Sequence, residues 1–207
     1  MSGYYVSIEG IDGAGTTTQA RLLADIFCSS YSVYLTREPS DGDVGRLVRR
    51  YIVEKKDIPE EAMALLFAAD RLTNYHCSIK PMRDSHALVI SDRCVLSSLV
   101  YQQHTLHHLE SSNWIAEINR FMIWPDLVVL IDIDAQTACE RRQARALAMG
   151  HTLEEDRYEV MTLQHQLVQA YQKLIFTLPC ATMLVDGALP KEVIAQQIAQ
   201  KISTLLK

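Results

Sequence analysis

Residues 4–19 read YYVSIEGIDGAGTTTQ, an apolar run followed by a glycine-rich stretch and the start of a helical pattern. This order predicts a buried strand, a loop and a helix. Glycines let the backbone N–H groups of such a loop curl around phosphate oxygens at the positive end of the following helix. The stretch therefore predicts a phosphate-binding loop within an α/β fold.

One position departs from the usual phosphate-binding pattern, G-x-x-x-x-G-K-[ST]. Gly10 and Gly15 frame the loop, and Thr17 occupies the place of the hydroxyl that holds Mg²⁺, but Thr16 stands where the lysine belongs. Without that lysine the glycines also fit an ordinary turn, so the interpretation depends on the strand before them and the helix after them. The sequence predicts a phosphate site that lacks one cation.

Composition and charge indicate a compact protein that is not built to bind nucleic acid. The chain of 207 residues is long enough for one sizeable core, so we expect a single domain over residues 1–207. A net charge of −5 disfavours non-specific binding to nucleic acid, which requires a basic face. Anionic substrates must therefore be held by local arginines.

Cysteine spacing and hydropathy disfavour further classes of protein. The five cysteines show no C-x-x-C spacing, which favours free buried thiols over a zinc site or a disulfide framework. The sequence has no apolar run of about 18 residues, as a membrane helix requires, and the first residues do not resemble a signal peptide. We expect a cytoplasmic protein.

Strand and helix patterns alternate along the chain without a low-complexity linker or an internal repeat. Strands are expected near 4–9, 33–36, 87–91, 126–132 and 181–185. Helices are expected at about 16–29, 43–54, 59–79, 94–104, 111–122, 135–148, 154–177 and 190–206. This alternation predicts an α/β fold, a doubly wound five-stranded parallel sheet flanked by helices, with ligands beyond the carboxyl ends of the strands.

Charged residues follow three of these predicted strands, at 36–39, 91–93 and 132–134. Each such group alone is typical of a solvated surface pair. Beside a phosphate-binding loop, however, they suit the binding of phosphate and metal. Asp92 therefore joins Thr17 as a candidate ligand of Mg²⁺.

Several stretches, taken together, resemble the thymidylate kinase family, the P-loop nucleoside monophosphate kinases that pass the γ-phosphate of ATP to dTMP. They are 8–15, 36–39, 66–71, 92–93 with Ser97 and 101–102, 125–127 and 156–159, and they occur in the family's order. The resemblance implies a P-loop NTPase-type fold with a mobile lid at about 141–157. It also implies ATP as phosphate donor, Mg²⁺, a homodimer, and dTDP as a product on the route to dTTP.

For the acceptor, the resemblance implies a dTMP site formed by Asp12, Arg37, Phe67, Arg71, Arg93, Ser97, Ser98, Tyr101, Gln102 and Tyr158. Phe67 would stack on the thymine ring and Arg71, one turn further along, would donate to a thymine carbonyl. From the residues alone, Phe67 fits the core face of an amphipathic helix better than a ligand site. Arg37 and Arg93 would hold the phosphate, and Tyr101 would crowd a ribose 2′-hydroxyl or simply pack on the sheet.

For the donor, the resemblance implies an ATP site formed by Gly10, Ile11, Asp12, Gly13, Ala14, Gly15, Thr16, Thr17, Thr18, Arg141 and Arg145. The expected catalytic residues are Asp12, Arg37, Arg93 and Arg145. Asp12 would meet the 3′-hydroxyl of the acceptor sugar. A general base is not needed, because the attacking phosphate oxygen is already ionised near neutral pH.

The missing lysine requires a substitute, since a cation about 4 Å from the transferred group is worth about 4 kcal/mol at an effective dielectric of 20. Candidates lie in the basic stretch at 141–145. Arg145 aligns with a lid arginine of one branch of the family, and Arg157 is a second candidate. Arg141 and Arg142 equally fit a basic helix end that complements the helix dipole. Residues 185–190 would form one wall of the adenine site.

Three functions remain open at this point. The first is an ATP:dTMP phosphotransferase, and the second is a phosphotransferase acting on thymidine or another pyrimidine nucleotide. The third is a nucleotide-binding protein that lost catalysis with its lysine and persists as a binding or scaffolding dimer. A GTPase fits poorly, because the guanine signature Asn-Lys-x-Asp is absent. A dimer would use apolar residues beyond the core stripe of the predicted helix 59–79, namely Ala62, Leu65, Leu66 and Ala69.

Overall fold

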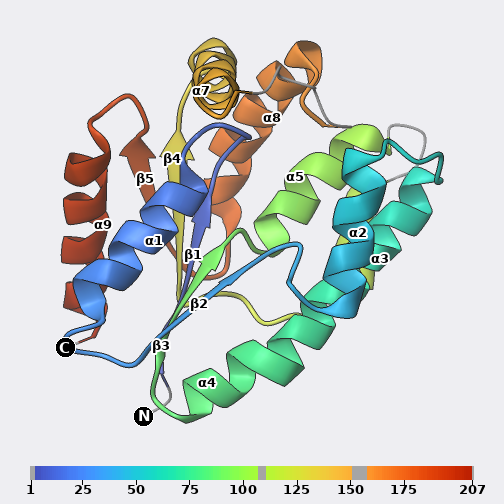
Figure 1. Cartoon of the computed structure of the whole chain (residues 1–207). Coiled ribbons are helices and arrows are strands. Elements are labelled where there is room, and N and C mark those ends of the chain that lie inside the picture. The colour runs from blue at the N-terminus through green and yellow to red at the C-terminus, as the bar shows by residue number, and fades with distance from the viewer. Residues whose placement is uncertain (1–2, 107–110, 151–157, 207) are drawn as a thin grey trace.

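The computed structural model describes residues 3–106, 111–150 and 158–206. Its centre is a five-stranded sheet, all of whose strand pairs are parallel, in the order β2-β3-β1-β4-β5 (Figure 1). The strands are β1 (Tyr5–Glu9), β2 (Val33–Arg37), β3 (Leu88–Asp92), β4 (Leu127–Asp132) and β5 (Ala181–Asp186). The predicted fold class is therefore confirmed, and every strand end lies within one residue of its expected position.

The burial of these strands explains why the sequence predicted their positions. β1 is buried throughout, and β3 and β4 are buried except at their last residues. Such strands appear as continuous apolar runs because helices cover both faces of the sheet. The edge strands β2 and β5 combine partly buried and exposed positions, and only Val185 of β5 is fully buried among them.

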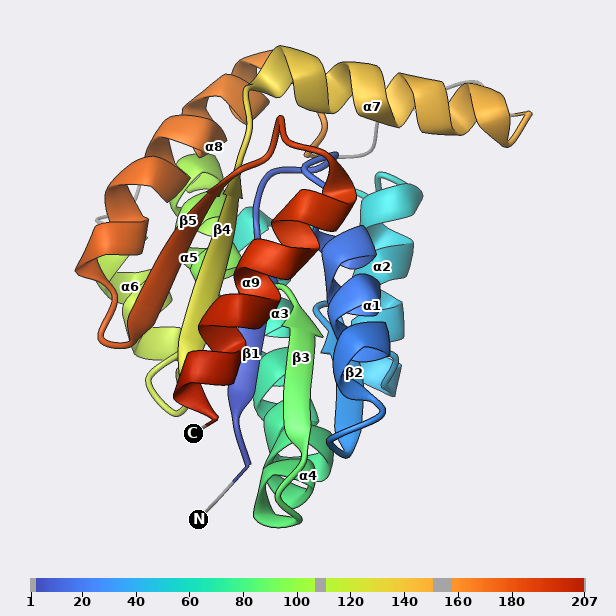
Figure 2. The same ribbon diagram turned by 90° about the vertical axis from the view of Figure 1, so that its left-hand side faces the viewer.

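Helices pack on both faces of the sheet. They are α1 (Thr16–Phe27), α2 (Asp43–Val53), α3 (Glu60–Asn74), α4 (Lys80–Asp84), α5 (Val95–Thr105), α6 (Ser111–Ile118), α7 (Ala135–Ala148), α8 (Met161–Leu174) and α9 (Lys191–Leu205). α1 and α9 cover one face, whereas α3, α5 and α8 cover the other (Figures 1 and 2). α7 runs across the carboxyl ends of the strands, so it roofs the region where ligands of such sheets bind (Figure 2).

The predicted helix 59–79 is longer than expected. α3 passes into a π-helical turn, η1 (Tyr75–Ile79), and then into α4, which contains Pro81. Proline lacks an N–H group and its ring clashes with the carbonyl four residues earlier in an α-helix. The wider π turn lies directly before Pro81, where the hydrogen-bond pattern must change, and it lets the helical path continue.

Two other helix boundaries were wrong. The predicted helix 111–122 ends at Ile118, because the Asn119 side chain donates to the Ile115 carbonyl at 2.9 Å in place of the backbone. The predicted helix 154–177 begins only at Met161, after an extended Val160, and ends in the 3₁₀ turn η2 (Ile175–Thr177). Residues 154–157 of that prediction lie outside the described residues.

All five cysteines are free, but only Cys94 and Cys139 are buried as expected. Cys28 and Cys77 are exposed and Cys180 is partly buried. Among the helices of the described chain, none combines the length and the apolar character needed to cross a bilayer.

Candidate active site

Strand register brings the ends of all five strands to one edge of the sheet. Ile8 pairs with Asp92, and Asp92 pairs with Arg37, so the ends of β1, β3 and β2 meet at one edge of the sheet. Asp132 of β4 pairs with Asp186 of β5 at the same edge. The charged residues that follow the strands in sequence are therefore brought together in space, as predicted.

The phosphate-binding loop lies between β1 and α1 and uses glycine where no other residue fits. Gly13 and Gly15 have φ values of +97° and +101°, in the left-handed region. A Cβ on Gly13 would also lie 2.3 Å from the Ala138 carbonyl oxygen, in the first turn of α7. The loop and the roofing helix are therefore in direct backbone contact.

A cavity of about 760 Å³ opens beside this loop. It is lined by the loop, the ends of β2 and β3, and residues of α2, α3, α5, α7 and α9. All of the predicted site residues line it except Gly10 and Ile11, which are buried. A volume of this size suits one or two nucleotide-sized ligands.

One cluster in the cavity joins the glycine loop to β3 and α5. The Asp12 carboxylate lies 2.6 Å from Nη2 of Arg93 and accepts the Tyr101 hydroxyl at 2.9 Å. Burial raises the pKa of Tyr101, so its hydroxyl stays protonated and donates. Arg93 itself has a φ of +79°, which directs its side chain into the cavity mouth near the loop.

Beneath this cluster lies a buried carboxylate that sequence reasoning did not single out. Glu9 accepts from the backbone N–H of Cys94 at 2.6 Å, from Ser97 Oγ at 2.7 Å and from the Tyr171 hydroxyl at 3.0 Å. Burial raises the pKa of Glu9. Glu9 therefore fixes the turn that carries Arg93, and only its place at the end of a buried strand signalled that role.

A second arginine, which the sequence analysis did not single out, accompanies Arg37 in the cavity lining. Arg37 and Arg49 both contact Asp41 Oδ1, at 2.6 Å and 2.8 Å. Arg49 of α2 also donates to the carbonyl oxygens of Pro39 at 2.7 Å and Ser40 at 2.5 Å. Burial, together with the positive charge of Arg37, lowers the pKa of Arg49. In the sequence, Arg49 is one of three arginines on α2, and arginine on an amphipathic helix is ordinarily a solvated residue.

The opposite end of the cavity is suited to a planar ring. Arg71 is buried and pairs with Glu38 at 2.7 Å, and it also donates to Ser98 Oγ at 2.8 Å and to the Asn119 side chain. Phe67 packs against the main core and also lines the cavity. Gln102 is buried, and its Oε1 has no hydrogen-bond partner among the described residues.

The residues proposed for Mg²⁺ lie beside the loop. Thr17 donates its hydroxyl hydrogen to Asp92 Oδ2, while Asp92 Oδ1 is buried without a hydrogen-bond partner in the described chain. No group of three or more His, Cys, Asp or Glu side chains within residues 3–106, 111–150 and 158–206 could hold a metal by itself. One free carboxylate oxygen beside a phosphate loop suits Mg²⁺, which usually combines one or two carboxylates with water and substrate phosphates.

The three arginines in the basic stretch of α7 differ in exposure and in contacts. Arg141 donates to the Gly187 carbonyl at 2.9 Å, which joins α7 to the segment after β5. Arg142 is buried, whereas Arg145 is exposed, and all three arginines line the cavity. Arg157, the other predicted candidate, lies outside the described residues.

The sequence model of one family, thymidylate kinase, matches residues 8–198, which include the loop, the strand ends and the roofing helix. This chain belongs to the thymidylate kinase family. The match covers most of the chain, so the earlier resemblance is confirmed.

Curated relatives bear the name "Probable thymidylate kinase". The one from Thermococcus gammatolerans is 40% identical over 186 residues, covering 86% of this chain and 85% of the relative. The one from Thermococcus kodakarensis is 36% identical over 211 residues, covering 98% of each chain. The one from Pyrococcus abyssi is 41% identical over 180 residues, covering 84% of this chain and 83% of the relative. Similarity to these thymidylate kinases therefore extends through the whole fold.

Proposed function

We propose that this protein transfers the γ-phosphate of ATP to dTMP and releases dTDP and ADP. One observation carries the proposal. A single cavity has a glycine loop at one side and three arginines, Arg37, Arg49 and Arg93, aimed at an anion on another. Two phosphate-binding centres within one cavity suit transfer between two nucleotides better than hydrolysis or binding of one.

The phosphate of the acceptor would displace the Asp41 carboxylate. Asp41 is exposed, and its one oxygen holds both Arg37 and Arg49 in place. Arginine forks bind a phosphate in the same way, with parallel N–H···O bonds. Asp41 therefore stands in for the phosphate, and Arg93 would reach it from β3.

The base of the acceptor would lie against Phe67, Ser98 and Gln102. A buried amide oxygen without a partner is costly, so Gln102 Oε1 is expected to accept the N3–H of a pyrimidine ring. Arg71, held by Glu38, would donate its remaining N–H to a ring carbonyl. Tyr101 and Asp12 would meet the sugar, the former restricting a 2′-hydroxyl and the latter accepting from the 3′-hydroxyl.

The reaction forms a bond between an acceptor phosphate oxygen and the γ-phosphorus, and breaks the bond between that phosphorus and the β–γ bridging oxygen. The attacking oxygen is already ionised, so the protein positions two anions in line and neutralises the charge between them. Thr17 and Asp92 would hold Mg²⁺, which supplies charge neutralisation on the donor phosphates. The loop N–H groups and Thr18 would bind the same phosphates.

The arginines of α7 would supply the charge that Thr16 cannot. In this proposal, residues 1–207 form one kinase domain in which Arg141 and Arg145 belong to a lid over about 141–157. Residues 151–157 of that lid lie outside the described residues. Arg141 also reaches the segment 185–190 through the Gly187 carbonyl. Leu189 of this segment and Ile194 of α9 line the cavity and suit an adenine ring.

A homodimer is part of the same proposal. Leu65 of α3 is 50% exposed and Val53 of α2 is 71% exposed, so these adjoining helices present apolar side chains to solvent. A second copy would bury them. Light scattering at micromolar concentration is expected to give twice the mass of one chain, and a monomer would remove this part of the proposal.

The competing function is a nucleotide-binding protein without catalysis, favoured by threonine in place of the lysine. The two are separated by incubating the protein with ATP, Mg²⁺ and dTMP at concentrations that saturate both sites, and resolving the products by ion-exchange chromatography. Appearance of dTDP with an equal amount of ADP supports the kinase. Saturated binding without dTDP supports the binding protein.

A further inference from the structure

Arg142 is the most deeply buried arginine side chain of the cavity wall, with 1% of the side chain exposed. Its Nε and Nη1 atoms have no hydrogen-bond partner among the described residues. Its contacts to Glu159 are long, 3.6 Å from Nη1 to Oε1 and 3.4 Å from Nη2 to the carbonyl oxygen. Buried N–H groups without partners are costly, and more so on a charged group. Arg142 therefore lines the cavity and carries two buried donors that the described residues leave without a hydrogen bond.

The position of Arg142 is fixed relative to the glycine loop. A Cβ built on Gly13 would lie 3.1 Å from Cγ of Arg142, so the aliphatic part of this side chain rests on the loop. The start of α7 is held by Asp134, which accepts from the Thr137 N–H at 2.8 Å. Arg142 follows two turns later, on the side that faces the loop.

We infer that Arg142, ahead of Arg145, supplies the positive charge that the loop lacks, by donating to the β- and γ-phosphates of the bound nucleotide. The expected effect of Arg142 on turnover of dTMP rests on the proposed function. The expected effect on nucleotide binding rests only on the position of Arg142 beside the loop. A phosphate edge would satisfy Nε and a terminal nitrogen together, in the paired arrangement that arginine prefers. Glu159 would be the resting partner that the phosphate replaces.

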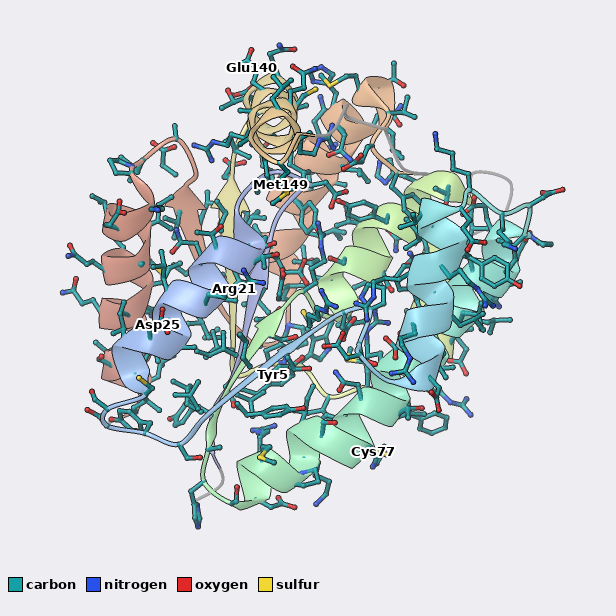
Figure 3. The ribbon with its side chains drawn as sticks, viewed as in Figure 1. Tyr5, Arg21, Asp25, Cys77, Glu140 and Met149 are labelled. Carbon is teal, nitrogen blue, oxygen red and sulfur yellow. The ribbon has the colours of Figure 1, made fainter. Side chains whose placement is uncertain are left out.

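Arg145 is less suited to this role. It lies nearly one turn further along α7 and its residue is exposed, so its charge is screened by solvent. Figure 3 shows Glu140 on the side of α7 that faces away from the sheet and Met149 at the end of the helix. Of the basic residues on α7, Arg142 alone combines burial with contact to the loop in the described chain.

The test begins with nucleotide binding in the absence of dTMP. The affinities of the wild-type protein and the Arg142→Met variant for ADP and for a non-hydrolysable ATP analogue are measured by calorimetry with Mg²⁺. Loss of charge-assisted hydrogen bonds is expected to weaken binding of the analogue by about tenfold or more. Methionine fills a similar volume without charge, and Arg142→Lys serves as a second variant that keeps the charge and is expected to keep part of the affinity.

Turnover of dTMP provides the second measurement. Arg142→Met is expected to lower kcat by roughly 10²–10³-fold, with little change in the KM for dTMP. Adding Thr16→Lys to Arg142→Met is expected to recover most of that loss. Glu140→Gln on the outer side of α7 and Arg120→Met on the surface are matched controls, expected to behave as the wild-type protein does.

The alternative is that Arg142 only holds the backbone and side chain of Glu159. Glu159→Gln would then reproduce the loss seen with Arg142→Met, and Thr16→Lys would not rescue either variant; this result overturns the inference. Unchanged analogue binding and turnover in Arg142→Met also overturn it while leaving the kinase standing. If the wild-type protein binds the analogue through Arg142 but does not phosphorylate dTMP, the proposed function fails and the phosphate contact stands.

Discussion

Asp12 and Arg93 meet across the cavity mouth, with Oδ1 of the carboxylate 2.6 Å from Nη2 of the guanidinium. They come from the loop after β1 and the turn after β3, separated by 81 positions in sequence. The pair thus links the glycine loop to the turn after β3. Arg93 also contacts Ser97 Oγ at 3.1 Å and the Tyr171 hydroxyl at 3.2 Å, so its head is held before any ligand arrives.

Replacing Arg93 tests that link. Arg93→Ala is expected to raise the KM for dTMP strongly, because Arg93 would hold the acceptor phosphate in the ground state and in the transition state alike. Steady-state kinetics at varied dTMP measure this change. Arg120→Ala, which removes an exposed arginine paired with Glu117, is the control and should leave the KM unchanged. An unchanged KM in Arg93→Ala would place the acceptor phosphate elsewhere.

Arg49 and Asp41 test the position of the acceptor phosphate more finely. Arg49→Ala is expected to weaken dTMP binding by about tenfold, the value of one charge-assisted hydrogen bond. Asp41→Asn is expected to tighten it, because the neutral side chain competes less with the phosphate for Arg37 and Arg49. Calorimetric titration with dTMP at low salt measures both. Weaker binding in Asp41→Asn would mean that Asp41 orients the arginines and does not stand in for the phosphate.

Glu9 makes stability depend on pH in a defined direction. Burial raises its pKa above the value of 4.5 of an ordinary glutamate, so the folded protein binds this proton more tightly than the unfolded chain does. The associated stability is full below 4.5 and is lost as the pH rises through the folded pKa. The free energy of unfolding of the wild-type protein should therefore fall relative to that of Glu9→Gln over this interval.

Urea unfolding of both proteins from about pH 4 to about pH 7 measures the difference, in which carboxylates common to both cancel. A difference of one pKa unit between the folded and unfolded states corresponds to about 1.4 kcal/mol. Parallel stability curves for the two proteins would show that Glu9 titrates as it does in the unfolded chain.

Thr16→Lys in the wild-type background tests whether α7 has replaced the lysine. With a compensating arginine the gain in kcat should be small, or a loss if two cations compete for one phosphate edge. Arg145→Ala is expected to lower kcat more than it weakens dTMP binding, since its charge would meet the donor phosphates. Without compensation, Thr16→Lys should raise kcat by roughly 10²–10³-fold. If Thr16→Lys gave that large gain while Arg145→Ala and Arg142→Met left kcat unchanged, the arginines of α7 would not have replaced the lysine.

The sequence predicted the sheet well because its inner strands, β1, β3 and β4, are buried on both faces. Such strands appear as apolar runs with sharp polar ends, and their parallel register then brings those ends together. Helix boundaries were predicted less accurately where a side chain or a proline alters the backbone hydrogen bonds of the helix. Asn119 ends α6 through its own hydrogen bond to Ile115, and η1 carries the helix on to Pro81 and α4.

The candidate site was predictable where residue type and place coincide, as in the loop and at Arg93. It was not predictable at Arg49, which lies on a helix where arginine is ordinarily a surface residue. The stretch 141–145 was a candidate from the sequence, but the sequence favoured Arg145 within it and did not show that Arg142 is the buried arginine. The importance of Arg49 and Arg142 comes from tertiary contacts: Asp41 draws Arg49 to Arg37, and the close approach of α7 to Gly13 buries Arg142. Neither contact leaves a pattern in the local sequence.

The central proposal is tested most directly by following ADP release in a coupled assay with ATP and Mg²⁺, using dTMP, dUMP, thymidine and CMP in turn as acceptors. The arginines at the phosphate end and the buried Gln102 predict rapid turnover with dTMP and little with thymidine, which lacks the phosphate, or with CMP, which carries a 2′-hydroxyl and lacks an N3–H. A preference for thymidine or CMP would contradict the acceptor assignment. Saturated binding without acceptor-dependent ADP would contradict catalysis itself.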